Sequence, residues 1–192
     1  MKIVDPDILG IQEAYLWQLN DEAIAREFGR QIGYELLHHR SGKSERSARS
    51  PVTKFKIKNA VGYPANFTRA ALSAEIELPN GHVLNVFVVH LDSMSSQTRI
   101  NEVTFLLDQL KSHKDEFTLI IGDMNFSARL EQKEGNILRE DGWIVSAGDW
   151  VDQIWVSPVL VPYVTTIQVW SDMVTGASDH YPTVVEVNLP SK

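Results

Sequence analysis

The sequence predicts an α/β fold, a layered sandwich in which sheets are covered by helices. Two observations support this prediction: strand-like segments recur along the whole chain, and two helical segments lie between them. The 192 residues are 43% hydrophobic and 22% charged, which is ordinary usage for a globular protein. A chain of this length can bury a core without disulfides or structural metals. We therefore expect one folded domain over residues 1–192.

The first part of the chain is expected to contain a strand, a helix and a basic segment. DILGI (7–11) is a short apolar run that predicts a buried strand. Residues 14–32 carry apolar side chains at helical spacing, and Gly33 is typical of a helix C-terminus. Residues 40–58 are expected to form a loop followed by a strand, because VTKFKI within them alternates with period two.

The rest of the chain predicts mainly strands. Residues 69–78 form one, Asn80-Gly81 is a signal for a two-residue hairpin loop, and HVLNVFVVH returns as the partner strand. Residues 99–112 predict an amphipathic helix. The remaining expected segments are the strand TLII, an irregular glycine-containing stretch to Gly148, and the strands VDQIWVS, YVTTIQVW and YPTVVEVNL.

Composition limits the kinds of site and of cellular location. The chain has no cysteine, so any metal must be held by Asp, Glu, Asn or His, which favours hard cations such as Mg²⁺ or Mn²⁺. The opening MKIVDPDILG does not resemble a signal peptide, and no run approaches the ~20 apolar residues of a membrane span. We expect a cytoplasmic protein without a membrane span.

Charge is distributed unevenly along the chain. The net charge is -7, yet residues 40–58 hold seven basic residues and a single acid, Glu45. Such a basic strip can attract phosphates. Its Ser, Gly and Pro content equally suits a solvated loop, and the two interpretations are compatible.

Acidic, amide and imidazole side chains recur at the ends of five apolar segments. They are Glu13, His90, Asp92, Asp123, Asn125, Asp152, Asp179 and His180. Any one of them is more often a turn or capping residue, but five such coincidences do not suit that explanation. Strand ends that meet at one rim would hold these groups rigidly. Carboxylates and an amide would then bind a hard cation, while two histidines could handle protons or phosphate charge.

The blocks DPDILGIQE, VFVVHLD, TLIIGDMN, VDQIWVS and ASDHYP, in this order, resemble the signature blocks of the endonuclease/exonuclease/phosphatase (DNase I-like) superfamily. They cover nearly the whole chain, and GDMN together with SDHYP is highly specific. The resemblance implies a four-layered α/β/β/α sandwich of two mainly antiparallel or mixed sheets flanked by helices. It also implies hydrolysis of phosphoester bonds with a divalent metal.

The resemblance further implies roles for individual residues. Glu13 would be the principal Mg²⁺ ligand, with Asp179 near the metal. Asp123 would orient and deprotonate the attacking water, and Asn125 would hold that water or a phosphate oxygen.

Other residues would supply positive charge. Asp152 would keep His180 cationic, so that the imidazole stabilises charge on the phosphoryl oxygens. His90 matches a second histidine of the deoxyribonuclease and sphingomyelinase branches, and Glu45 is a weak match for the acid that supports this histidine in deoxyribonuclease. Arg69 matches a phosphate-contacting arginine. Trp170, with Met173, is a candidate wall against a base or lipid, although ordinary loop packing is the stronger alternative.

Two regions depart from the family pattern. Family members begin with a strand ending in asparagine and then a helix, whereas this sequence opens at MKIVDPD. We therefore expect an exposed strand edge, and with it self-association or impaired catalysis. Between Gly33 and Phe67 the chain is also more basic and less apolar than the family, which weakens any alignment there.

Substrate choice is not determined by the fold. The basic segment favours nucleic acid, so the first hypothesis is a compact nuclease acting on DNA or RNA by direct attack of water. The alternatives are a phosphomonoesterase or lipid phosphodiesterase of the same superfamily, and a catalytically impaired phosphate-binding pseudoenzyme.

Overall fold

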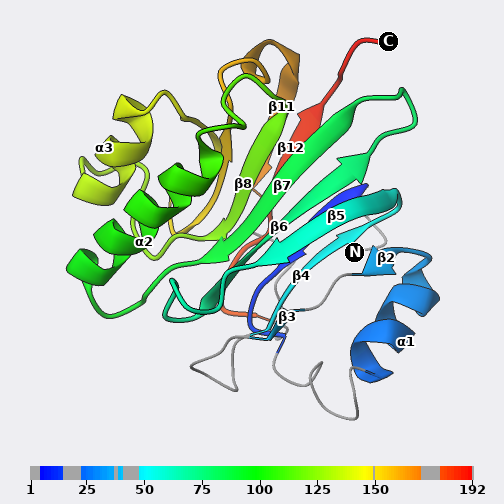
Figure 1. The fold of residues 1–192 in the computed structure, drawn as a ribbon, viewed down its shortest axis with the longest axis horizontal. Coiled ribbons are helices and arrows are strands. Elements are labelled where there is room, and N and C mark those ends of the chain that lie inside the picture. Colours follow the sequence, from blue (N-terminus) through cyan, green and yellow to red (C-terminus); the bar gives the residue numbers. More distant parts are fainter. Residues whose placement is uncertain are drawn as a thin grey trace.

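A mixed sheet of six strands lies at the centre of the structure (Figure 1). The computed structural model describes residues 5–14, 23–36, 39–40, 48–148, 150–169 and 178–191. In sheet order the strands are β5 (Lys56–Gly62), β6 (Ala70–Glu77), β7 (Val83–His90), β8 (Thr118–Asp123), β10 (Asp152–Val156) and β9 (Ile144–Ala147). All neighbouring pairs are antiparallel except β7 and β8, which run parallel. These two strands therefore end at the same edge of the sheet.

Both faces of this sheet are buried, which explains why its central strands are apolar at consecutive positions. Phe87 and Val89 of β7 pack in one core with residues of two helices, whereas Val86 and Val88 pack in a second core on the opposite face. The helices are α2 (Ser96–Leu110) and α3 (Lys133–Glu140), and they lie side by side (Figure 1).

Two smaller groups of strands cover the opposite face. The first contains β1 (Ile8–Ile11), β2 (Glu35–Leu36), β3 (His39–Arg40) and β4 (Ala48–Thr53), with β4 pairing to the other three. The second is the hairpin of β11 (Val164–Val169) and β12 (Thr183–Val187), which the 3-10 helix Val161–Tyr163 precedes. Helix α1 (Ala23–Ile32) contacts β2 as the outer layer. These layers confirm the predicted α/β/β/α sandwich.

The strand β1 has a ladder partner on one side only. It pairs with β4, and no strand among the described residues pairs with its other edge. Within the described ranges, β12 pairs only with β11. The second layer is thus two separate sheets, each with an open edge.

Most predicted elements are confirmed, and the differences have local causes. The stretch expected to be irregular up to Gly148 contains α3 and β9, so that expectation was wrong. Helix α3 escaped detection because it is short and carries Gly135 in its first turn, where an added Cβ would lie 3.2 Å from the Phe126 ring. Within the described ranges, no helix has the length and apolar character needed to cross a membrane.

Two further boundaries differ from expectation. The hairpin after β6 has a three-residue loop rather than a two-residue one, because the N–H of Leu78 donates to the carbonyl of His82 at 2.9 Å. Gly81 supplies the positive φ of 82° that this loop requires. Within the basic segment, residues 48–58 contain β4 and the start of β5, joined at Lys54 and Phe55. Residues 15–22 of the helix expected over 14–32 lie outside the described residues, and α1 covers the part from Ala23 to Ile32.

Candidate active site

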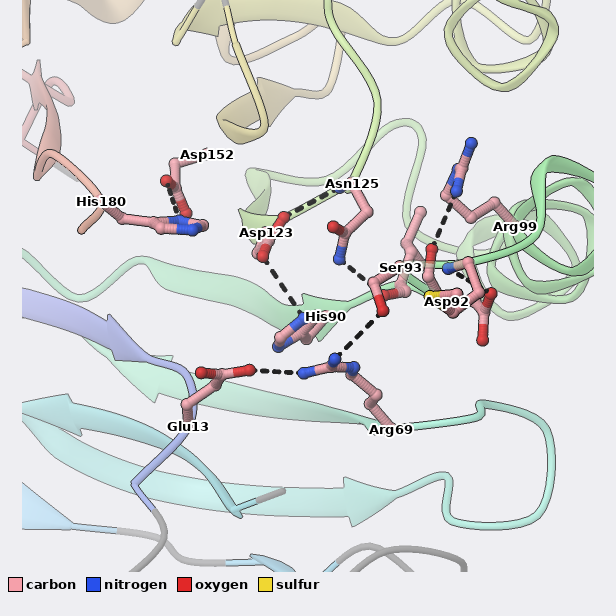
Figure 2. A network of polar contacts seen from close by, with 12 residues as sticks. Glu13, Arg69, His90, Asp92, Ser93, Arg99, Asp123, Asn125, Asp152 and His180 are labelled. Atoms are coloured by element: carbon pink, nitrogen blue, oxygen red, sulfur yellow. Dashed lines mark hydrogen bonds and ion pairs between the residues drawn. The ribbon is translucent and has the colours of Figure 1, made fainter. Parts of the chain in front are cut away.

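Three neighbouring strands place three polar side chains next to one another at one edge of the central sheet. His90 ends β7 and Asp123 ends β8, and the parallel register sets them opposite each other. Asp152 opens β10, whose antiparallel register sets it opposite Asp123 on the other side. The sheet itself thus aligns His90, Asp123 and Asp152 in one row (Figure 2).

Asp152 holds a histidine that comes from another part of the chain. His180 Nδ1 lies 2.7 Å from Asp152 Oδ2, and the N–H of His180 donates to Ser178 Oγ at 3.1 Å. Burial acts to lower the pKa of His180, but the negative charge and hydrogen bond of Asp152 outweigh it, so the pKa is raised above 6.5. The contact therefore favours the imidazolium form.

Asp123 is buried and has contacts on both oxygens. Oδ1 accepts a hydrogen bond from the backbone N–H of Asn125 at 2.9 Å, and Oδ2 lies 3.3 Å from His90 Nε2. Burial raises the pKa of Asp123, with the positive charges of His180 and Arg69 acting in the opposite direction. Burial likewise raises the pKa of Asp152.

Gly122 and Asn125, the first and last residues of GDMN, suit the backbone conformation at the end of β8. Gly122 has φ 138°, and a Cβ there would lie 2.0 Å from the carbonyl oxygen of Val89. Asn125 has φ 50°, in the left-handed region that asparagine tolerates better than most residues, and its Nδ2 donates to the carbonyl of Leu91 at 2.9 Å. These contacts tie the turn after β8 to the loop after β7.

Glu13 and Arg69 form an ion pair facing this row (Figure 2). Glu13 follows β1 and has a positive φ of 57°, which is uncommon for glutamate. Arg69 immediately precedes β6, and its Nη2 donates to Ser93 Oγ at 3.1 Å. Ser93 was not anticipated from the sequence, because serine after a strand is an ordinary loop residue.

Asp92 has the structural role typical of an aspartate at a strand end. Its Oδ1 accepts hydrogen bonds from the N–H groups of Met94 and Ser95, at 2.9 and 2.6 Å. Asp92 thereby organises the turn that enters α2, where Ser95 is the N-cap.

The oxygen-rich donor set suits a hard divalent cation. Asp123, Asp152 and His180 each offer a ligand atom, and these atoms lie within 4.8 Å of one another. Glu13 and the exposed Asp179 add two further carboxylates close to this cluster. Their negative charges act on it, because Glu13 raises the pKa of Asp123 and Asp179 raises the pKa of Asp152. Carboxylate oxygens are the ligands that Mg²⁺ and Mn²⁺ prefer.

Some predicted residues are not in this cluster. Trp170, Met173 and Glu45 lie outside the described residues, as does most of the loop part of the basic segment. Lys54 of that segment bonds acids rather than facing the site, with Nζ 3.1 Å from carboxylate oxygens of both Asp5 and Asp7.

The fold and the site together define the class of protein. A sandwich whose central sheet presents carboxylates, histidines and an arginine at one edge has the groups needed to hydrolyse phosphoester bonds. The model of the Endonuclease/Exonuclease/phosphatase family matches residues 2–180, so the chain belongs to that family of phosphoester hydrolases. No curated protein matches the chain.

Solved structures with the same fold act on different phosphoesters. The mannosyl-6-phosphatase of Bacteroides thetaiotaomicron has a TM-score of 0.77 at 18% identity, covering 98% of this chain and 87% of its own. An AP endonuclease from Archaeoglobus fulgidus has a TM-score of 0.75 at 17% identity, with coverages of 98% and 91%. The 3'-5' exonuclease NExo of Neisseria meningitidis has 0.74 at 18% identity, with 96% and 90%. At these identities the likeness establishes the fold.

Proposed function

We propose that this protein is a divalent-metal-dependent phosphodiesterase that hydrolyses nucleic acid by direct attack of water. The observation that carries the proposal is the convergence of a buried carboxylate, Asp123, with the Asp152–His180 pair, their ligand atoms lying within 4.8 Å of one another. Hydrolysis of a phosphodiester needs a base beside the water and positive charge around the phosphoryl oxygens. This cluster contains both.

Asp123 is the proposed general base. Burial raises its pKa above that of an ordinary carboxyl, which improves its strength as a base. The Asn125 N–H and His90 fix the orientation of its two oxygens. Asp123 can then accept the proton of a water positioned in line with the scissile bond.

Positive charge comes from two directions. His180, whose pKa Asp152 raises, presents an imidazolium on one side, and Arg69 presents a guanidinium next to Glu13 on the other. Glu13 and Asp179 are the proposed holders of the divalent cation. When bound, such a cation neutralises phosphoryl charge and lowers the pKa of water.

Exposed apolar side chains beside the site favour nucleic acid as the substrate. Trp150 is 69% exposed two residues before Asp152, and Tyr181 is 53% exposed directly after His180. Met94, 89% exposed, directly follows Ser93. Nucleobases stack on aromatic side chains such as Trp150 and Tyr181 with little dependence on sequence. An AP endonuclease and an exonuclease among the structural neighbours agree with this choice.

A phosphomonoesterase is the second candidate, favoured by the likeness to a mannosyl-6-phosphatase. The test is turnover of supercoiled plasmid, single-stranded DNA, RNA, bis-p-nitrophenyl phosphate and p-nitrophenyl phosphate, with Mg²⁺, Mn²⁺ or EDTA. We expect metal-dependent cleavage of diesters, abolished by EDTA and lowered by at least about 10³-fold in Asp123→Asn. Turnover confined to the monoester supports the second candidate. No turnover with either metal refutes both.

The proposed stacking of bases on Trp150 has its own test. Trp150→Ala is expected to raise the KM for single-stranded DNA about 10-fold, because stacking contributes about 1–3 kcal/mol per base. The effect on bis-p-nitrophenyl phosphate should be much smaller. The matched control is Ile144→Ala, an exposed apolar residue at the start of β9 and therefore at the opposite end of the strand pair β9–β10. Equal losses on both substrates in Trp150→Ala would contradict base stacking.

A further inference from the structure

Two charged residues of α2 lie on the side of the helix that faces the core. Glu102 is 2% exposed and Arg99 is 8% exposed, and they share this buried stripe with Val103, Leu106 and Leu110. A buried charge is costly unless hydrogen bonds or an opposite charge compensate it. Their contacts therefore indicate why the helix keeps them there.

The carboxylate of Glu102 joins two loops that are distant in sequence. Its Oε1 accepts a hydrogen bond from the backbone N–H of Thr68 at 2.6 Å, and its Oε2 accepts one from the backbone N–H of Asp92 at 2.7 Å. Thr68 lies before β6 and Asp92 lies after β7. One buried side chain thus fixes the relative position of these two chain segments.

Arg99 binds the backbone of the same residue, Asp92, and connects it to α3. Its Nη1 donates to the carbonyl of Asp92 at 3.0 Å, and its Nε lies 3.0 Å from Oε1 of the buried Glu134. Both the N–H and the carbonyl of Asp92 are therefore bound by charged side chains of α2. Figure 2 shows Arg99 beside the loop that contains Asp92 and Ser93.

The residues that follow Thr68 and Asp92 are those that meet at the site. Arg69 follows Thr68, Ser93 follows Asp92, and Arg69 Nη2 donates to Ser93 Oγ at 3.1 Å. The guanidinium also binds Glu13. Any shift between the two loops that Glu102 joins would change the position of Arg69 relative to Ser93.

We propose that Glu102 is a positioning residue, which acts through Thr68 and Asp92 to hold the Arg69 guanidinium toward the phosphate. This inference rests on the proposed function. The charge of the carboxylate matters because both of its partners are N–H donors. A glutamine of the same shape can accept from only one of them and would set its own NH₂ against the other.

A double-mutant cycle with Arg69 tests the proposal. Glu102→Gln is expected to raise the KM for diester substrates about 10-fold with a smaller change in kcat, because Arg69 binds the phosphate before and during reaction. In the Arg69→Ala background the same change should add less than 2-fold. The control on the same helix is Asp108→Asn, an exposed residue paired with Lys111, which should leave both parameters unchanged. Equal fold losses in both backgrounds would overturn the proposal.

Two further measurements separate positioning from a loss of folding or of function. The ¹⁵N–¹H signal of Arg69 Nε reports order without any turnover. It should shift and lose order in Glu102→Gln but not in Asp108→Asn, and an unchanged signal would overturn the proposal even if the protein proves inactive. Should Glu102→Gln not fold, Ser93→Ala at an exposed position replaces it, with the same rise in KM and the same lack of additivity with Arg69→Ala expected. Additive effects of Ser93→Ala would count against the inference.

Discussion

Asp123 and Asp152 lie directly opposite each other on neighbouring strands, so the sheet forces two carboxylates together. Burial raises the pKa of both, and the charge of Asp123 raises the pKa of Asp152 further. His180 compensates, since its charge lowers the pKa of both acids. The three side chains therefore function as one coupled unit, and a change in one alters the others.

Replacement of Asp152 tests this coupling. Asp152→Asn removes the largest influence that raises the pKa of His180, while burial continues to lower it, so the pKa should fall. The alkaline limb of the activity profile should move to lower pH with it. Because the folded pKa of His180 is raised, its contribution to stability is present at acidic pH and is lost as pH rises through that pKa. NMR titration of His180 in the metal-free protein measures the shift, and an unchanged pKa would contradict the coupling.

At the scale of elements, the end of β8 shows how local backbone geometry determines residue identity. Gly122 is required because its φ is positive and the carbonyl of Val89 occupies the place of a side chain. The apolar residues Leu119, Ile120 and Ile121 before it pack on both faces of the sheet and hold the strand in place. A rigid strand that ends in a tight turn delivers Asp123 to a fixed position.

Gly122→Ala should therefore damage both stability and activity. An added Cβ would lie 2.0 Å from Val89 O, so we expect a loss of about 3 kcal/mol in the free energy of unfolding, measured by urea denaturation. The matched control is Gly142→Ala, which also has positive φ but whose Cβ would meet only Pro158 Cγ at 3.8 Å. The control should lose about 1 kcal/mol. Similar losses in both variants would show that the close approach at β8 is unimportant.

Elements with a strong apolar period were predictable, and those with a weak one were not. The strands β7 and β8 and the helix α2 were expected near their observed bounds, because each carries a long apolar pattern. Helix α3 was missed because only Ile137 and Leu138 are large apolar residues within it. In the candidate site, the motif residues were found from strand ends, whereas Glu102 was hidden within the stripe of an otherwise ordinary amphipathic helix. The presence of a charged residue on that stripe was the signal in the sequence that could have identified Glu102.

At the scale of the whole molecule, the second layer is divided into two groups of strands with an open edge each. Among the described residues, β1 and β12 each pair on one side only, and all four residues of β1 are partly exposed although three are large and apolar. An apolar strand with free N–H and carbonyl groups readily pairs with another strand.

We therefore expect self-association that depends on β1. Sedimentation equilibrium between about 5 and 500 μM should show a monomer in exchange with larger species, and Leu9→Lys should favour the monomer because lysine on an edge opposes strand pairing. The comparison variant is Val61→Lys, at an exposed position in β5, which should leave the association unchanged. A monodisperse monomer over this concentration range would contradict this expectation.

The sequence alone determined most of the strands, two of the helices, the family and the polar groups at the strand ends, because apolar period, glycine and asparagine act through the nearest few residues of the chain. The tertiary structure decided which of those groups meet. His180 bonds Asp152 across 28 residues, and Glu102 bonds Thr68 across 34. Such contacts depend on how the sheets and α2 pack, and packing depends on the whole chain rather than on any one segment.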